Sequence, residues 1–349
     1  MAHLIGVGLM GLGAIGASHA RALAALRDRS RLIAYSGGDT ERAAEAGWPE
    51  AEQLSPEQLL ADDRIEVVAL ATPSALHAQQ ALAALDAGKH VVVEKPLAMT
   101  AGDAELVVER AAARGLHVAV VSQRRLEPEV VAVREALEAG RLGAIRLATT
   151  HVHWWRDPSY YRAAAWRGEA GNGGSLLNQG VHNVDLLRWL AGPVESVTAQ
   201  QATLAHPTEA EDTTVATLRF TSGALGLIST STATPPGSPA TLTLHCERGV
   251  VEIGQGEILR WQVEGVPAPQ LDHDGAAIGV GASDPGAIGI AGHVQQWDDV
   301  LTALAAGRAP SITGRDGAET VRLLDALTTA AATGSLVTLG DLPTAGGRS

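Results

Sequence analysis

Three segments of the sequence carry side chains whose types and spacing suit chemistry on a small polar molecule. The first, GKHVVVEKPLAMT, follows an apolar run with Glu94, Lys95 and Pro96. If that run is a parallel strand, Lys95 stands at its carboxyl end, where open α/β sheets bind ligands. A lysine there is placed to touch a substrate hydroxyl and a cofactor ribose. A solvated surface lysine is the competing interpretation.

The second segment, GNGGSLLNQGVHNVDLLRWL, contains Asn178, His182 and Asp185. Their spacing of i, i+4 and i+7 predicts one shared face of a helix. A histidine flanked by a carboxamide and a carboxylate is a tuned proton acceptor, and Asp185 is able to fix its tautomer. One histidine without a nearby cysteine is a poor zinc ligand set, so we expect no metal. A capping or core histidine is the structural alternative.

The third segment, HVHWWRDPSYYRAAAWRG, gathers aromatic side chains between residues 154 and 166 in a chain that is 3% aromatic. Together with His153, Arg156 and Arg167, these rings suit a polyhydroxylated ligand that is apolar on its C–H face and polar at its rim. Ordinary interface packing would use the same residue types.

A glycine-rich turn lies near the start of the chain. The dinucleotide-binding fingerprint G-x-G-x-x-G fits HLIGVGLMGLGAIGASHA in two overlapping frames. The frame that starts at Gly6 leaves a very short strand and a helix interrupted by glycines, each of which costs about 1 kcal/mol relative to Ala. The frame of Gly11, Gly13 and Gly16 places only its last glycine inside the helix. We therefore prefer the second frame.

Periodicity predicts the elements that hold these segments. After a strand over Leu4–Met10 and a helix over about Ala14–Arg27, apolar runs of strand length alternate with longer helical patterns as far as residue 123. This alternation is typical of a parallel sheet covered on both faces. Residues 1–123 are therefore predicted to form a doubly wound domain.

The pattern changes from about Arg124 onward. After one helix, segments of alternating polarity between Ala144 and Ile253 predict a mainly antiparallel sheet with one covered face and one face that seeks a partner. Two helices close the chain, and the Pro/Gly-rich stretch Gly265–Gly292 is predicted to be a mobile loop. We assign residues 124–349 to a second, α/β domain and leave open whether its C-terminal helices pack back on the first.

Composition narrows the class of protein. A chain of 349 residues with 46% hydrophobic and 19% charged residues is typical of two soluble globular domains. A net charge of −13 without a basic run argues against nucleic acid and membrane surfaces as partners. The uncharged run over residues 4–17 has no preceding Lys or Arg, which disfavours a signal peptide. The single cysteine, Cys246, fits a reducing compartment, so we expect a cytoplasmic protein.

Taken in order, these segments resemble the Gfo/Idh/MocA family of NAD(P)-dependent oxidoreductases over essentially the whole chain. The resemblance is carried by GLGAIG, ATPSALH, GKHVVVEKPLAMT, SQRR, WRG, GGSLLNQGVHNVDLLRWL and GRAPSITGRDG. It implies an N-terminal Rossmann domain and a C-terminal α/β domain whose large open, mainly antiparallel sheet forms the interface of a homodimer or homotetramer. It also implies hydride transfer between NAD(P) and a carbon of a sugar, polyol or sugar derivative.

The resemblance assigns roles to individual residues. Lys95 matches the family's active-site lysine, which polarises the reacting oxygen, and His182 matches its proton-transferring histidine. Asn178 stands where many members carry Asp, so it orients substrate or histidine without holding charge, and Asp185 completes the catalytic set. The expected cofactor-binding residues are Gly11, Gly13, Ala14, Ile15, Gly16, Ser36, Arg42, Thr72, Pro73, His77, Glu94, Lys95, Gln123, Trp166 and Arg167. The expected substrate-binding residues are Lys95, Arg124, His153, Trp155, Arg156, Tyr160, Asn178 and His182.

The cofactor preference rests on the end of the second predicted strand. An NAD enzyme usually places an acidic residue there to bind the ribose diol. Here the position is Ser36, with Thr40 and Arg42 close behind, as in NADP-accepting members of the family. Asp39 is the residue that could still reach a diol. We expect NADP(H) to be modestly favoured over NAD(H), because an acid at the strand end would repel the 2′-phosphate.

Two other functions are compatible with the same sequence. A redox-neutral sugar enzyme would use bound NAD(P) through a keto intermediate, and a regulator would bind dinucleotide or sugar without turnover. A regulator needs no proton acceptor, whereas this chain keeps both Lys95 and His182. We therefore expect an NAD(P)-dependent dehydrogenase or ketosugar reductase that acts on a CH–OH group.

Overall fold

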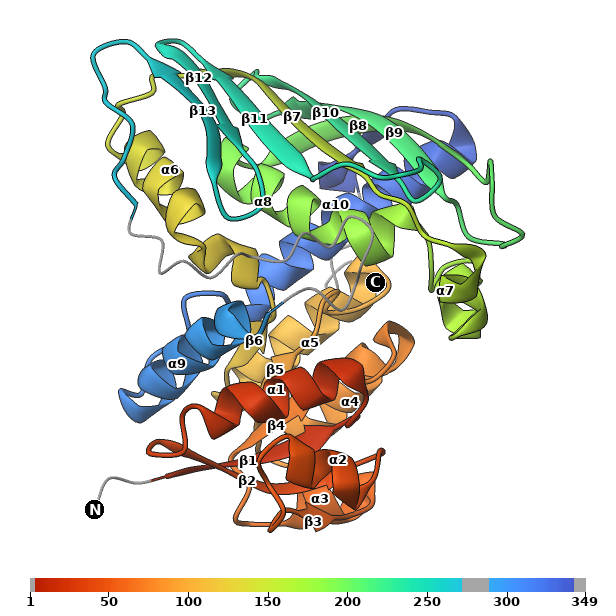
Figure 1. Cartoon of the computed structure of the whole chain (residues 1–349), viewed down its shortest axis with the longest axis vertical. Helices are drawn as coiled ribbons and strands as arrows, with labels where there is room; N and C mark the ends of the chain where they lie inside the picture. The colour runs from red at the N-terminus through yellow and green to blue at the C-terminus, as the bar shows by residue number, and fades with distance from the viewer. Residues whose placement is uncertain (1–3, 272–288, 342–349) are drawn as a thin grey trace. The chain divides into compact units, whose positions relative to one another are not determined.

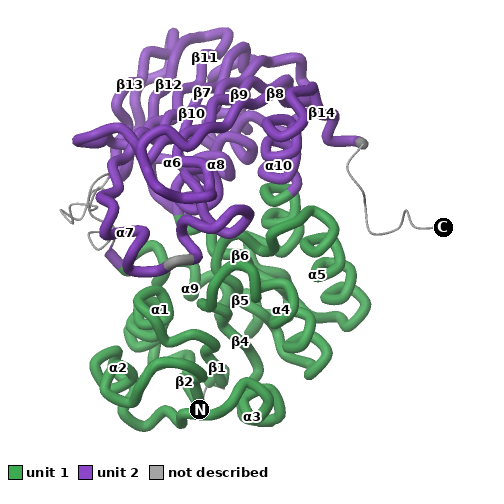
Figure 2. Tube along the Cα trace, turned by 90° about the vertical axis from the view of Figure 1, so that its right-hand side faces the viewer, with its two compact units in different colours: residues 1–123, 290–321, 343–349 green, residues 124–289, 322–342 purple. Residues whose placement is uncertain are grey.

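The structure, a computed structural model, describes residues 4–271 and 289–341. The chain folds into two compact units, which are distinguished by colour in Figure 2. Unit 1 comprises residues up to Gln123 and the segment 290–321, and unit 2 comprises the rest of the described chain. Residues 290–321 are thus assigned to unit 1 and residues 322–341 to unit 2. Residues 272–288, most of the predicted mobile loop, lie outside the described residues.

Unit 1 is built around a six-stranded parallel sheet in the order β3-β2-β1-β4-β5-β6. The strands are β1 (Ile5–Met10), β2 (Ser30–Ser36), β3 (Glu52–Gln53), β4 (Val67–Leu70), β5 (His90–Val93) and β6 (Val118–Val120). This is the Rossmann order, which changes direction between β1 and β4 and binds ligands at the carboxyl ends of those strands. The predicted doubly wound domain is confirmed.

Helices cover both faces of this sheet. One core contains side chains of α1 and α9, and the other contains side chains of α3, α4 and α5 together with the start of α10. The bounds are α1 (Ala14–Ala24), α2 (Thr40–Glu45), α3 (Pro56–Ala61), η1 (Ser74–Leu76), α4 (His77–Asp86), α5 (Ala101–Arg114), η2 (Gln123–Leu126), α9 (Ala291–Ala305) and α10 (Gly314–Thr333). Burial on both faces explains the continuous apolar runs of the strands.

Unit 2 contains an eight-stranded mixed sheet in the order β13-β12-β11-β7-β10-β9-β8-β14. Its strands are β7 (Ile145–His153), β8 (Val194–Ala202), β9 (Thr213–Phe220), β10 (Leu225–Ser231), β11 (Thr241–Cys246), β12 (Gly249–Ile253), β13 (Ile258–Val263) and β14 (Val337–Thr338). Only β7 and β10 pair in parallel within this sheet, so the predicted mainly antiparallel sheet is confirmed.

Helices lie on one face of the unit 2 sheet, as Figure 1 shows for α6, α8 and α10. The remaining bounds are α6 (Pro128–Glu138), α7 (Pro158–Arg162), η3 (Ala165–Gly168), η4 (Ser175–Gly180), α8 (Val181–Ala191) and η6 (Leu339–Asp341). On the opposite face, Leu147, Val215 and Leu225 are 37% to 50% exposed. Among the described residues, no helix covers these side chains; we call this surface the open face.

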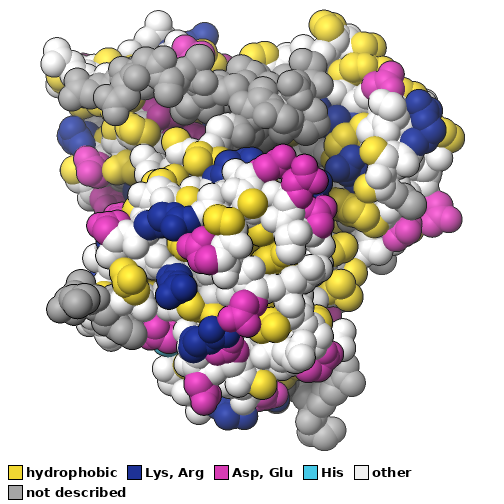
Figure 3. All heavy atoms as spheres, turned by 60° about the horizontal axis from the view of Figure 1, so that its bottom comes forward, with side chains coloured by type: hydrophobic (Ala, Val, Ile, Leu, Met, Phe, Trp, Pro, Cys, Tyr) yellow, Lys and Arg dark blue, Asp and Glu magenta, His cyan; other side chains and the backbone are white. Residues whose placement is uncertain are grey.

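The surface agrees with the charge balance of the sequence. On the face drawn in Figure 3, the described Lys and Arg side chains are interspersed with Asp and Glu, and no patch of one sign forms among them. Within the described residues, no helix combines the length and the apolar character that a membrane span requires.

Candidate active site

The loop between β1 and α1 shows which glycine frame the fold uses. Gly11 has a φ of +93°, and a Cβ there would lie 2.6 Å from the Ala71 carbonyl oxygen. A Cβ on Gly16 would lie 2.0 Å from the carbonyl oxygen of Gly11, whereas a Cβ on Gly13 would meet nothing within 4 Å. The outer two glycines are therefore required by the fold, and Gly13 leaves open space in front of α1.

These three roles are those of the dinucleotide fingerprint: a tight turn, close approach of a pyrophosphate, and helix–strand packing. Gly13 is the N-cap of α1 and makes no side-chain capping bond. The N–H groups of Ala14 and Ile15 stand at this helix start, which favours an anion through the helix dipole. The residues present therefore fit a dinucleotide cofactor.

The end of β2 supplies the predicted ribose-binding edge. Ser36 is buried, and the Asp39 carboxylate accepts a hydrogen bond from the Arg42 backbone N–H at 2.8 Å, which caps α2. The Arg42 guanidinium reaches back to the Leu12 carbonyl oxygen at 3.3 Å. One oxygen of Asp39 thus caps α2, and the Arg42 guanidinium contacts the glycine loop.

His77 connects the ends of β4 and β5. Its Nδ1 lies 2.7 Å from the Pro96 carbonyl oxygen and its Nε2 lies 2.9 Å from the Thr72 carbonyl oxygen. Burial lowers the pKa of His77, and the two carbonyl contacts oppose that shift. Pro73 follows Thr72 and caps η1. His77 therefore fixes the spacing of two strand ends at the ligand-binding edge of the sheet.

Lys95 directly follows β5, as the sequence predicts. Burial lowers the pKa of its ammonium, and the negative charge of Glu94 opposes that shift. The Lys95 backbone N–H donates to Glu94 Oε2 at 3.2 Å, and the peptide bond to Pro96 is cis. Two buried histidines that the sequence analysis missed, His19 and His293, contact Glu94 Oε1.

In unit 2, the segment that carries Asn178 and His182 is not one continuous α-helix. Residues Ser175–Gly180 form the π-helical turn η4, and α8 begins at Val181, so Asn178 lies in the wider turn and His182 in the first turn of α8. Glu211 accepts hydrogen bonds at 2.7 Å from the Leu176 N–H and from the Ser175 hydroxyl, which anchors the start of the turn. π-Turns are rare and are frequent at functional sites.

Asp185 has a partner that the sequence analysis did not select. Arg125 donates from Nε to Asp185 Oδ2 at 2.7 Å and from Nη2 to Oδ1 at 2.5 Å, and both side chains are buried. The neighbouring Arg124 donates to Asn183 Oδ1 and to the Gly254 carbonyl oxygen. The segment SQRR, which contains Arg124 and Arg125, was the sequence motif that could have pointed to these two arginines. The role of Asp185 toward His182 stays a prediction.

The aromatic side chains between residues 154 and 166 pack next to η4, and we call this surface the aromatic shelf. Gln179 donates to the Tyr160 hydroxyl at 2.9 Å, and the guanidinium of Arg167 lies 4.2 Å from the centre of the Tyr160 ring. Arg156 is buried, with its guanidinium 4.8 Å from the centre of the Trp154 ring. Tyr160 therefore contacts two arginines, Arg156 and Arg167, and the carboxamide of Gln179 in η4.

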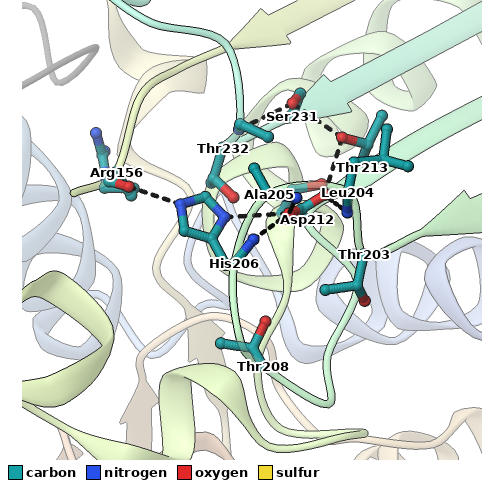
Figure 4. A network of polar contacts seen from close by, with 12 residues as sticks. Arg156, Thr203, Leu204, Ala205, His206, Thr208, Asp212, Thr213, Ser231 and Thr232 are labelled. Carbon is teal, nitrogen blue, oxygen red and sulfur yellow. Dashed lines mark hydrogen bonds and ion pairs between the residues drawn. The ribbon is translucent and has the colours of Figure 1, made fainter. Parts of the chain in front are cut away.

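A buried carboxylate holds the base of this shelf, as Figure 4 shows. Asp212 accepts hydrogen bonds from the backbone N–H groups of Leu204, Ala205 and His206, and His206 Nδ1 donates to it at 3.1 Å. Burial alone would raise the pKa of Asp212, but these hydrogen bonds hold it below its usual value. His206 Nε2 lies 2.8 Å from the Arg156 carbonyl oxygen, and its ring contacts that of Trp155.

The structure does not bring His153 together with these residues. Thr150 of the same strand faces α8 through its bond with Asn183, and successive strand residues point to opposite faces, so His153 lies on the open face. There it contacts Ser229 Oγ at 2.7 Å and lines a cavity of about 580 Å³ with His151. Strand alternation directs His153 away from α8, and its expected substrate contact stays a prediction.

Two further predicted residues are Gln123 and Trp166. Gln123 ends unit 1, and its Oε1 is buried without a hydrogen-bond partner among the described residues. Trp166 is half-buried in η3, with the Arg167 guanidinium 5.7 Å from its ring centre. The predicted contacts of these two residues with the cofactor stay predictions.

Comparison with known proteins identifies the family. The oxidoreductase family with an NAD-binding Rossmann fold matches residues 5–122, and the Gfo/Idh/MocA C-terminal domain matches residues 130–252. The chain belongs to the Gfo/Idh/MocA family. As a member of this family it is an NAD(P)-dependent oxidoreductase of the CH–OH dehydrogenase type, with an NAD-binding Rossmann fold.

Several relatives of this Gfo/Idh/MocA protein bear names that specify a reaction. Inositol 2-dehydrogenase of Rubrobacter xylanophilus is 30% identical over 280 residues, which cover 78% of this chain and 77% of the relative. The scyllo-inositol 2-dehydrogenase (NADP⁺) IolW of Bacillus subtilis is 30% identical over 56% of this chain and 54% of the relative. The WlbA dehydrogenase of Bordetella pertussis, solved with NADH and UDP-GlcNAcA, is 36% identical, covers 96% of this chain and 99% of its own, and superposes with a TM-score of 0.84.

Proposed function

We propose that this protein oxidises a secondary hydroxyl of a sugar, polyol or sugar derivative, or reduces the corresponding ketone, with NAD(P) as hydride carrier. The observation that carries the proposal is the glycine loop, which leaves open space at Gly13. In this member of the family, Lys95 follows β5 and His182 lies at the start of α8. The names of the inositol and UDP-sugar relatives support a polyhydroxylated substrate.

In the oxidative direction, the substrate's hydroxyl proton passes to His182 while its C–H hydrogen leaves with the bonding electron pair, and the carbon becomes a carbonyl. Nicotinamide, when bound, supplies the hydride acceptor, or the donor in the reverse direction. Lys95 polarises the reacting oxygen and stabilises the negative charge that develops there. Asn178 orients the substrate or the imidazole, and as a carboxamide it adds no negative charge.

We propose the aromatic shelf as the part of unit 2 that recognises the substrate. Tyr160 presents an aromatic ring, and Arg156 and Arg167 flank it with donors, a combination that suits a sugar ring. Asp212 supports this proposal indirectly, because its five hydrogen bonds with neighbouring groups fix the loop against which the shelf packs.

We propose that NADP(H) is preferred over NAD(H). One relative is named as an NADP⁺ enzyme and another was solved with NADH, so the preference is inferred from this chain's own residues. Ser36 adds no charge at the end of β2, Asp39 is engaged in capping α2, and Arg42 lies against the glycine loop as a counter-charge for a 2′-phosphate.

We propose that the open face joins two or more copies of the chain. Leu147 and Leu225 are direct neighbours on the paired strands β7 and β10, and both are exposed. An exposed apolar strip on a sheet without a second layer is typical of a subunit interface, and closed symmetry predicts a dimer or tetramer.

A substrate panel tests the proposed activity. The protein is mixed with NADP⁺ or NAD⁺ and with inositols, aldoses and nucleotide-linked sugars, and the absorbance of the reduced nicotinamide is followed. We expect net reduction with at least one member of the panel. Cofactor binding without turnover would instead indicate a regulator, and product formation without net reduction would indicate a redox-neutral enzyme.

A further inference from the structure

A cluster of buried polar side chains lies beneath Lys95 in unit 1. His19 of α1, Glu94 at the end of β5 and His293 of α9 are 2%, 8% and 5% exposed. The Nε2 atoms of His19 and His293 lie 3.1 Å and 3.3 Å from the same carboxylate oxygen, Glu94 Oε1. Residues from three distant parts of the chain therefore converge on one carboxylate, and neither histidine has a part in the proposed reaction.

A tryptophan fixes the proton positions in this cluster. Trp297 Nε1 donates to His19 Nδ1 at 2.9 Å, and an indole nitrogen is only ever a donor. His19 Nδ1 is therefore the acceptor, so the ring proton sits on Nε2 and is donated to Glu94. Burial lowers the pKa of His19, which favours this neutral form. His293 Nε2 faces the same oxygen and must also donate to it.

The same three side chains have the residue types and spacing of a metal site. The partners of the other ring nitrogens argue against one, because a metal-bound histidine donates its second N–H to an acceptor. His19 Nδ1 faces the indole N–H, which is a donor, and His293 Nδ1 has no hydrogen-bond partner among the described residues. The surroundings of the two rings therefore favour N–H donors, rather than a cation, at the contacts with Glu94.

We propose that His19 and His293 are positioning residues: their Nε2–H groups hold Glu94 as a carboxylate, and this buried anion keeps Lys95 in its ammonium form. The proposal rests on the proposed function for the importance of that ammonium. Glu94 uses its other oxygen to accept the Lys95 backbone N–H at 3.2 Å, so both carboxylate oxygens are engaged and the anion is held next to the residue that bears the ammonium.

The electrostatics follow from the surroundings of Glu94. Burial alone would raise the pKa of this carboxyl, but the hydrogen bonds from His19 and His293 hold it well below its usual value. The charged and titratable groups that face Glu94 are these two histidines from α1 and α9, His77 from α4, and Lys95 itself. Loss of either donor makes the charged form of Glu94 less favourable. Loss of the negative charge on Glu94 removes its opposition to the burial that lowers the pKa of Lys95.

The lysine content of the chain makes this effect directly measurable. Lys89 and Lys95 are its only lysines, so NMR of protein labelled at the lysine side chain gives two side-chain titrations. Lys89 donates to the Asp62 carbonyl oxygen and serves as an internal reference. Lys89→Arg assigns the two signals. The measurement needs no substrate and no turnover.

We expect His293→Leu and His19→Leu to lower the pKa of Lys95 by about one unit, which is a tenfold change in the proton affinity of its amine. His293→Gln, whose amide can still donate, should restore most of the native value. His117→Leu, at a half-buried histidine of the same unit, should leave Lys95 unchanged. In the assay with substrate, the basic limb of the kcat/KM profile should move to lower pH by the same amount.

The result that would overturn the proposal is an unchanged Lys95 titration in folded Leu variants. If those variants do not fold, Glu94→Gln, which has the same shape, must lower the pKa of Lys95 or the proposal is wrong. Stoichiometric Zn²⁺ binding to the native protein that is lost in His19→Leu would also overturn it. A Lys95 pKa that falls as expected, combined with full turnover by Lys95→Met, would refute the proposed role of Lys95 in the reaction and leave the positioning role intact.

Discussion

Substitution of Gly13 by Ala separates cofactor binding from folding. Gly13 has φ −83° and ψ −157°, a conformation open to any residue, and a Cβ there would meet nothing within 4 Å. Its loss as an N-cap should cost at most about 1 kcal/mol of folding free energy. The added methyl group would enter the open space in front of α1, where a pyrophosphate would approach the backbone.

The expected loss of affinity follows from the hydrogen bonds to that anion. A hydrogen bond to a charged group is worth about 1.5–3 kcal/mol. Displacement of one such bond should therefore raise the Kd for NADPH and NADH by about 10- to 150-fold. The assay is a titration followed by nicotinamide fluorescence, with thermal unfolding measured on the same samples.

Two other glycines supply controls. Gly102→Ala, at an exposed position in α5 with its nearest neighbour at 4.0 Å, should stabilise the helix by about 1 kcal/mol and leave Kd unchanged. Gly16→Ala should destabilise the fold itself, because its Cβ would lie 2.0 Å from the Gly11 carbonyl oxygen. A folded Gly13→Ala protein that binds both cofactors with native Kd would refute the assignment of the loop.

Three further predictions concern cofactor choice, pH and assembly. Ser36→Asp should reverse a preference for NADP(H), measured as the ratio of the two Kd values; native protein that binds NAD(H) more tightly would contradict the proposal. Burial raises the pKa of Glu211 to about 7, above its usual 4.5, so the stabilising effect of this group is complete below pH 4.5 and is lost as pH rises through 7. Glu211→Gln should therefore reduce the fall in the free energy of unfolding between pH 5 and pH 8, measured by urea titration. An identical fall in the variant would disprove the attribution of this pH dependence to Glu211. Leu225→Lys should shift the species seen by light scattering from dimer or tetramer toward monomer, and a native protein that is already monomeric would rule out the open-face interface.

Local sequence patterns were sufficient for the nucleotide-binding half of the fold. The glycine frame could be chosen because helix interiors disfavour glycine, and Gly11, Gly13 and Gly16 then show the three expected environments. The predicted strand over Leu4–Met10 and helix over about Ala14–Arg27 became β1 and a slightly shorter α1. Apolar runs that alternate with helical periodicity predicted the parallel sheet, because strands buried on both faces need apolar side chains at every position.

Contacts between distant segments were out of reach. His293 meets Glu94 across 199 residues of sequence, and Trp297 meets His19 across 278, so no local pattern marks this cluster. The start of the π-turn over Ser175–Gly180 is anchored by Glu211, which follows α8 and β8 in the chain. The position of His153, by contrast, follows from a local pattern, because the period of two along β7 places it on the face opposite Thr150.

The central claim is that His182 moves the proton while the substrate carbon exchanges a hydride. The most direct test is a single-turnover measurement on native protein and His182→Ala, with the cofactor and the substrate that the panel identifies. Native protein should form reduced nicotinamide and carbonyl product in equal amounts. His182→Ala should do so more slowly by about 10²–10⁴-fold, with an unchanged Kd for the cofactor. Native turnover by His182→Ala would contradict the account.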